Sequence, residues 1–482
     1  MTRTTPARAH RKVSLAFATA AVLSVGISIG AAKAQRVIDQ PVDGPVLIDS
    51  NQTLTITPKG SITAVDVGGQ RVDGIVLAAG GGNNEISNHG VITARRDGIL
   101  FRADELFSSS NSNIIKNLGR IEAGARGFVI FGNDNTFQNF GSVGGGDKTV
   151  QMVGDRNVVD NFGRMFSGGN GIEISGNGNT ITSSGSILTS SSNSIGIFVD
   201  GGGNMITVSG LVVSPDRAFD ISSNGNAPNF LNLQAPAFLG GRIMLGSTDP
   251  TTVNITTSVS HSMVWTFEGP MAGGAPNVTG PAASFFNAST NQFVTLDSTS
   301  LATAVDSLGD MTSLLSNVTR QGLAGRFDSP YGSTYGMKDS KGGPASAQGK
   351  NFWVTPFGGR TSHQGDAATL DRDISQAGVA FGYRWQHQPG LGLSVMAGYI
   401  HDESEASSRF AKSHDGKADG AFAGVSARRQ WGNLFLDFTL MGGVLSHDQD
   451  RFVNDNLADL GKSSASANFD SRFISSEAGV CR

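Results

Sequence analysis

The sequence predicts an all-β protein that begins with a parallel β-helix solenoid, continues through a linker helix and ends in part of an antiparallel β-barrel. Three features support this prediction: a repeat of about 22 residues in the first half, one stretch with helical spacing of apolar residues, and longer alternating strands near the end. A high glycine content, 65 of 482 residues, suits the many tight turns that such an architecture needs.

The repeat is an Asn followed by an apolar residue two places on, a Gly six places on and an apolar residue two beyond that. Its six copies begin at Asn84, Asn113, Asn135, Asn157, Asn179 and Asn204. Alternating apolar residues broken by Gly or Asn favour short half-buried strands and tight turns. We therefore expect a β-helix over residues 35–230, in which Asn117, Asn139 and Asn161 bond from coil to coil. The alternative is a disordered Gly/Asn-rich tract, but such tracts do not hold apolar residues in register.

Residues 1–34 have the organisation of a signal peptide. Basic residues precede an apolar run from Val13 to Ala32, and Ala32-Lys33-Ala34 fits a small-residue cleavage site. A membrane anchor is the alternative, although the Ser and Gly residues in the run make it a poor one. The only cysteine is Cys481, so we expect no disulfide framework. The net charge of −4 contains no polybasic signal, so nucleic acid is not an expected partner.

The middle of the chain changes character twice. The repeat ends near residue 225, and residues 231–297 keep strand-like alternation around Trp265, so we expect them to cap the solenoid. Apolar residues then recur at steps of three and four between Leu301 and Val318. This spacing predicts an amphipathic helix over residues 301–320, within a linker that spans residues 298–349.

Residues 350–482 contain longer strands in which apolar and small or polar residues alternate. The clearest alternation sets Val379, Phe381, Tyr383 and Trp385 against Gly378, Ala380, Gly382 and Arg384. Lipid-facing and lumen-facing sides of a membrane barrel alternate in this way. Short connections also alternate with long ones, which we expect at residues 360–376, 401–418 and 446–467. A soluble β-sandwich is the alternative.

The order of these parts resembles the classical autotransporters of Gram-negative bacteria, with a pertactin-like passenger. Three stretches support the resemblance: FWVTPFGG at residues 352–359, GVAFGYR at 378–384 and FDSRF at 469–473. The barrel-motif residues within them are Trp353, Phe357, Gly382, Tyr383 and Arg384.

The resemblance implies a mechanism of secretion. The chain would be exported by the Sec route through the periplasm, and the barrel assembly machinery would insert its C-terminal part into the outer membrane. The helix would then occupy the barrel pore, and the passenger would be displayed at the cell surface. The implied partner is a ligand on a host or neighbouring cell, and no cofactor is implied.

The C-terminal end departs from the family pattern. Family members close a barrel of about twelve strands and finish on an aromatic residue, whereas we expect six strands here and the sequence ends in Gly-Val-Cys-Arg. Open strand edges are not tolerated in lipid, so we expect a truncated or frameshifted product that does not insert as a stable barrel. A small complete barrel of six strands is the alternative, as is a remnant without function.

The strongest polar cluster in the repeats comprises Asp134, Asp155 and Arg156, with Asp160 and Arg164 nearby. Carboxylates beside basic residues on neighbouring coils could bind calcium or act as an acid and base pair on a polysaccharide. Ordinary surface ion pairs explain the same residues. We expect no catalytic, cofactor or metal site, and we interpret the passenger as a non-enzymatic adhesin or interaction surface. A β-helix surface enzyme that acts on polysaccharide is the alternative.

Overall fold

The computed structural model describes most of the chain from residue 33 onward. The described ranges are residues 33–65, 72–78, 80–101, 110–222, 227–297, 309–315, 317–318, 351–365, 370–388, 390–407, 410, 412–431 and 434–481. The predicted signal peptide therefore lies almost entirely outside the described residues. So do residues 298–308 and 319–350 of the predicted linker.

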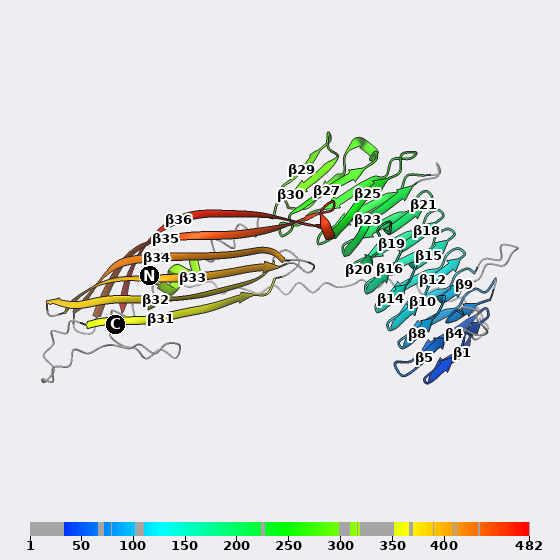
Figure 1. Cartoon of the computed structure of the whole chain (residues 1–482), viewed down its shortest axis with the longest axis horizontal. Helices are drawn as coiled ribbons and strands as arrows, with labels where there is room; N and C mark the ends of the chain where they lie inside the picture. Colours follow the sequence, from blue (N-terminus) through cyan, green and yellow to red (C-terminus); the bar gives the residue numbers. More distant parts are fainter. Residues whose placement is uncertain are drawn as a thin grey trace, which may run out of the picture.

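The first part of the chain is a stack of short parallel strands, arranged in three columns (Figure 1). The first column comprises β1 (Ala34–Ile38), β4 (Gln52–Ile56), β7 (Glu85–Asn88), β10 (Ile114–Asn117), β13 (Thr136–Asn139), β16 (Val158–Asn161), β19 (Thr180–Ser183), β22 (Met205–Val208), β24 (Phe230–Gln234), β26 (Thr252–Thr256) and β28 (Asn277–Thr279). The second comprises β2 (Pro41–Asp43), β5 (Ser61–Ala64), β8 (Val91–Ala94), β11 (Arg120–Ala123), β14 (Ser142–Gly145), β17 (Arg164–Ser167) and β20 (Ser186–Thr189). The third comprises β3 (Val46–Ile48), β6 (Ile75–Leu77), β9 (Asp97–Phe101), β12 (Arg126–Phe131), β15 (Lys148–Val153), β18 (Asn170–Ser175) and β21 (Ile195–Asp200). The second and third columns both continue into β23 (Leu211–Ser222) and β25 (Phe238–Leu245). The predicted solenoid is therefore confirmed.

Every coil places the same positions inside. The apolar residue two places after each Asn forms a buried ladder: Ile86, Ile115, Phe137, Val159, Ile181 and Ile206. The predicted Asn bonds are confirmed, since Asn117 Nδ2 donates to Asn139 Oδ1 at 2.8 Å and Asn139 Nδ2 donates to Asn161 Oδ1 at 2.9 Å. A second ladder runs from Asn84 to Asn229 and binds backbone amides of the preceding coil. The side-chain oxygens of both ladders thus have donors in the adjacent coils, whereas the buried Asn179 Nδ2 has no partner among the described residues.

Parallel pairing continues beyond the end of the sequence repeat. The strands β24, β26 and β28 extend the first column to Thr279 without the Asn-to-Gly phrase, because Leu231, Leu233, Val253 and Ile255 keep the inward alternation. The last coil contains β27 (Met263–Glu268) and η1 (Ala272–Gly274). An antiparallel group, β27 with β30 (Gln292–Thr295) and β30 with β29 (Ser284–Asn287), then closes it. Trp265 is fully buried there, as expected of a cap.

The C-terminal part is an antiparallel, curved sheet of six long strands (Figure 1). They are β31 (Asn351–His363), β32 (Asp371–Gln388), β33 (Leu391–Ser407), β34 (Lys412–Trp431), β35 (Leu434–Asp455) and β36 (Lys462–Cys481), with η2 (Asp459–Gly461) before the last. Each strand pairs with the next, and within the described residues no pairing joins β31 to β36. The sheet is therefore an open part of a barrel.

The predicted long connections are wrong in extent. Residues 360–376, 401–418 and 446–467 lie mostly in paired strands, which continue well past the segment needed to cross a membrane. We expected loops from the alternation of short and long connections, but opposite charges that face one another across strands stabilise a sheet. An example is Lys417 in β34, which lies 3.5 Å from Glu403 in β33.

Aromatic rings lie over glycines of the neighbouring strand on the inner side of this sheet. The cross-strand pairs are Trp353 with Gly382, Phe357 with Gly378, Phe422 with Gly398 and Phe473 with Gly443. A Cβ atom at any of these glycines would overlap the facing ring. Two of the predicted barrel-motif residues, Trp353 and Gly382, thus pack against each other. Because Gly382 has no side chain, the indole of Trp353 fits over its backbone.

Replacing Asn139 by Ala should lower the free energy of unfolding of the solenoid by about 2–4 kcal/mol, because it leaves two buried amide groups, on Asn117 and Asn161, without their partner. Urea denaturation followed by circular dichroism measures this change. Gln138→Ala, the outward neighbour on the same strand, is the control and should cost less than about 1 kcal/mol. Equal losses for the two variants would contradict the ladder's role.

Replacing Gly382 by Ala should destabilise the sheet by about 1–3 kcal/mol, because the added methyl group displaces the Trp353 ring. Thermal melting of the detergent-solubilised protein provides the measurement. Gly359→Ala is the matched control in β31, since nothing lies within 4 Å of a Cβ at that position. A Gly382→Ala protein that melts with the control would show that the indole does not need this space.

Candidate functional site

The inner side of the C-terminal sheet holds a helix. Residues 309–315 and 317–318 are helical, in agreement with the prediction for 301–320, whose remaining residues lie outside the described part. Met311, Leu315 and Val318 occur at steps of four and three, and each side chain is at most 5% exposed. They belong to one apolar cluster with Trp353, Ala380, Met396, Ile400, Phe422, Met441 and Leu445, against which Phe357 of β31 and Phe473 of β36 also pack. The helix is therefore held by side chains on the inner side of the sheet.

The outer side of the same strands is apolar. In β32 the predicted alternation is confirmed. Phe381 and Tyr383 are 45% and 37% exposed, whereas Ala380, directly before Phe381, is buried. In β35 the exposed residues are Leu434, Leu436, Phe438 and Leu440, and Asp437 and Thr439 face inward. An apolar outer face around a filled interior is what a bilayer requires of a barrel wall.

Two pairs of polar side chains on the inner side lie directly opposite each other on neighbouring strands. Gln376 donates to Asp402 at 2.8 Å, and Arg428 binds Asp437 through two hydrogen bonds of 2.6 Å each. The apolar cluster lies between the two pairs along the strands. Arg384, the last residue of the predicted barrel motif, shares this side with Arg428 and has no ion pair among the residues the structure describes. Tyr383 faces outward and stacks on Trp385, with ring centroids 6.0 Å apart.

The tip of the β35–β36 hairpin contacts the end of the solenoid. The side-chain oxygen of Asn454 accepts hydrogen bonds from Trp265 Nε1 at 2.7 Å and from the backbone amide of Leu239 at 3.0 Å. Its amide group donates to the carbonyl oxygens of Leu239 and Gly461, at 2.7 Å each. A pair of β-bridges also joins β27 to β35 in parallel orientation. The indole of the passenger cap thus has its hydrogen-bond acceptor on the sheet.

A second asparagine reproduces this contact two residues later. Asn456 is fully buried, accepts a hydrogen bond from the amide of Thr266 at 2.8 Å and donates to the carbonyl oxygens of Gly241 and Thr266 at 3.1 Å each. Sequence analysis missed both residues, because they lie in the stretch that we expected to be a loop. The only local signal is the Asn-Asp-Asn triplet at 454–456, which is too short to be distinctive.

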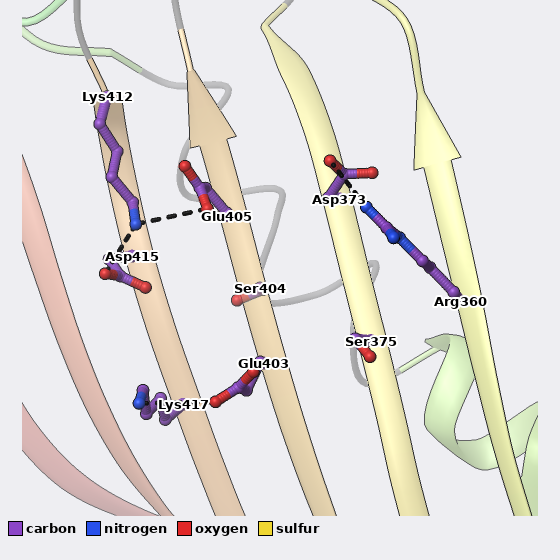
Figure 2. Close-up of a pocket in the computed structure, with 9 residues that line it drawn as sticks. All are labelled: Arg360, Asp373, Ser375, Glu403, Ser404, Glu405, Lys412, Asp415 and Lys417. Carbon is purple, nitrogen blue, oxygen red and sulfur yellow. Dashed lines mark hydrogen bonds and ion pairs between the residues drawn. The ribbon is translucent and has the colours of Figure 1, made fainter.

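A cavity of about 420 Å³ lies on the outer side of β31–β34 (Figure 2). Four acidic and three basic side chains line it and form ion pairs. The ion pairs are Arg360–Asp373, Lys412–Asp415 and Lys417–Glu403, at 3.5, 2.8 and 3.5 Å. The arrangement explains how the extended strands remain paired outside the apolar zone.

The predicted cluster Asp134, Asp155 and Arg156 is only partly brought together. Arg156 binds Asp134 through two hydrogen bonds of 2.8 Å, on exposed turns of adjacent coils. Hydrogen bonding to Arg156 lowers the pKa of Asp134, and the same bonds raise the pKa of Arg156. Asp155 instead accepts from the backbone amide of Asn177 at 2.7 Å and so supports the next coil.

The two neighbours of that cluster have separate surroundings. Asp160, in β16, accepts a hydrogen bond from Gln138 at 3.1 Å. Arg164 lies around the corner in β17, and its guanidinium has no partner among the described residues. The five residues therefore do not converge on one point.

A more extensive polar network, which sequence analysis missed, runs along the third column. Arg126 binds Asp97 at 2.8 and 2.7 Å and also donates to Gln151 at 2.7 Å. Gln151 donates to Glu173 at 3.1 Å, and Arg96 binds Asp73 on the preceding coil. Asp73, Asp97 and Arg126 each directly precede a Gly, which is a signal that the sequence did contain. Both aspartates are buried and paired, so removal of either arginine would leave an uncompensated buried charge.

Two further observations concern the described residues as a whole. No three His, Cys, Asp or Glu side chains in the described ranges are placed to hold a metal ion together. In the same part of the chain, no helix combines the length and the apolar character needed to cross a membrane.

Comparison with known families gives one match. Residues 352–480 match the family described as the Autotransporter beta-domain, which covers almost the whole six-stranded sheet. Comparisons with curated proteins and with solved structures give no match. Residues 352–480 therefore belong to the autotransporter β-domain family, and the chain has the two-part organisation of a classical autotransporter, a β-helix passenger followed by part of its barrel.

Proposed function

We propose that the chain is secreted by its own C-terminal domain and displays the solenoid at the surface of a Gram-negative cell. Residues 1–34 would direct export by the Sec route, and the barrel assembly machinery would insert the sheet into the outer membrane once the open edges of β31 and β36 are paired. The solenoid would remain attached outside through the helix and the hairpin tip. An autotransporter β-domain implies an outer-membrane location for this part of the chain.

The observation that supports the proposal best is the helix on the inner side of the sheet. It follows the solenoid in the sequence, and its apolar side chains are buried where a barrel has its pore. The outer side of the same strands is apolar, so the helix and the lipid would lie on opposite sides of the wall.

We propose further that the passenger is a non-enzymatic adhesin. The predicted carboxylates already have partners, because Asp134 is bound by Arg156 and Asp155 supports the next coil. A glycosidase requires two carboxyl groups that flank a substrate bond, one of them able to donate a proton. The alternative, an enzyme acting on polysaccharide, would be favoured by release of sugar fragments from cells or purified glycans.

Replacing Leu315 by Asp in the full-length protein should reduce surface display at least tenfold, because a carboxylate would be buried in the apolar cluster. Display is measured in a Gram-negative host as the amount of passenger removed by protease from intact cells. Ser313→Asp adds the same charge to the exposed side of the helix and should retain display within about twofold.

The proposal fails if the wild-type passenger stays inaccessible to protease in intact cells while the protein is present in the membrane fraction. It also fails if Leu315→Asp and Ser313→Asp display the passenger equally. Fractionation of both variants distinguishes loss of display from loss of the protein.

A further inference from the structure

The passenger carries a stripe of exposed apolar side chains at the corner between its first and second columns. Leu118, Phe140 and Phe162 occupy the same position on three successive coils, directly after Asn117, Asn139 and Asn161. They are 47%, 49% and 45% exposed. The rings of Phe140 and Phe162 are stacked, with centroids 4.9 Å apart and planes 14° from parallel. Because the three side chains are contiguous and exposed, this stripe is a candidate binding surface.

The stack ends abruptly at the next coil. Ser184 holds the position equivalent to Phe162, because Ser183 pairs with Asn161 in the register of the first column. Successive coils are separated by about 4.8 Å, close to the spacing at which the two phenyl rings stack. No ring therefore covers the face of Phe162 that points toward the next coil. The spacing of one coil leaves room there for one further ring.

Polar residues flank Phe162 in the chain, with Asp160, which accepts a hydrogen bond from Gln138, two residues before it. Arg164 lies two residues after Phe162, and its guanidinium has no partner among the described residues. Its neighbours in the column are Ser142 and Ser186, which carry hydroxyl groups and no compensating charge. Phe166, 45% exposed, faces Gly144, above which the surface is open because only one atom would lie within 4 Å of an added Cβ.

We propose that this surface, the Phe162 platform (Phe140, Phe162, Arg164, Phe166, Ser184 and Ser186), binds an acidic glycan. The C–H face of a pyranose ring is apolar and slightly positive, so it packs on the negative face of an aromatic ring. Hydroxyl groups at the sugar rim match the serines, and a carboxylate on the sugar would pair with the guanidinium of Arg164. The proposal names the ligand class of the adhesin proposed above and depends on that function.

The shape of the platform favours a glycan over a protein. A specific protein interface covers about 800 Å² on each partner and usually places its anchors in pockets. The platform is instead a small set of exposed side chains bordered by Ser and Gly, and the repeat of the solenoid suits a ligand that is itself a linear repeat.

The test measures binding of the full-length, detergent-solubilised protein to immobilised polygalacturonate, with neutral dextran as the comparison. The wild type should bind polygalacturonate in a salt-sensitive manner and dextran at least tenfold more weakly. Phe162→Ala should weaken binding at least tenfold, and Arg164→Gln should remove most of the preference for the acidic polymer. Phe230→Ala and Arg36→Gln, exposed residues elsewhere on the solenoid, are controls and should bind within about twofold of the wild type.

A second variant separates binding from folding. Ser184→Phe adds a ring to the stack and covers the open face of Phe162, so it should abolish binding while circular dichroism and melting stay as in the wild type. The inference is overturned if the wild type does not bind polygalacturonate, or if Phe162→Ala and Ser184→Phe bind it as well as the wild type does. If these variants still adhere to cells like the wild type, adhesion stands and the glycan platform falls. If the displayed wild type adheres to neither cells nor glycan, both proposals fall.

Discussion

The solenoid depends on hydrogen bonds between successive coils, and buried asparagines make the most demanding of them. Each coil is too small to bury its own apolar residues, so it is stable only between two neighbours. The Asn side chains set the register of that stack, because a shift of one residue would place an amide against an apolar ladder and leave its bonds unmade. The apolar ladders provide the driving force, and the amides provide the alignment.

The C-terminal sheet meets the same need for burial in a different way. Its strands cannot stack in coils, so the inner side is filled by large rings over glycines and by a helix inserted from an earlier part of the chain. Two pairs of its polar inner residues bind the residue directly opposite, Arg428 with Asp437 and Gln376 with Asp402. In both halves, buried polar side chains form hydrogen bonds with residues on the neighbouring strand. In the solenoid the bonds join successive coils, and in the C-terminal sheet they join the strands of a hairpin.

Much of this could be predicted from local patterns in the sequence. The repeat identified the coils, the Asn ladder and the pairing of Asp134 with Arg156, because each needs only the spacing between coils. The spacing of Met311, Leu315 and Val318 identified the buried face of the helix. The contact of Asn454 with Trp265 could not be found in this way, because it joins residues 189 positions apart that belong to different periodic patterns. The buried Asp97 was missed for another reason: a charged residue beside a turn normally lies at the surface, and only its partner Arg126 permits burial.

The contact between the hairpin tip and the solenoid has a mechanical consequence. A solenoid of stacked coils is stiff along its axis, so a pull on the distal coils near β1 turns the whole structure like a lever about its attached end. Asn454 and Asn456 hold that end to two long paired strands, so the load passes into the β35–β36 hairpin along its length (Figure 1). Shear parallel to paired strands loads many hydrogen bonds at once, whereas peeling would break them one at a time. The force that the contact between the passenger and the sheet withstands should therefore depend on the direction in which the passenger is pulled.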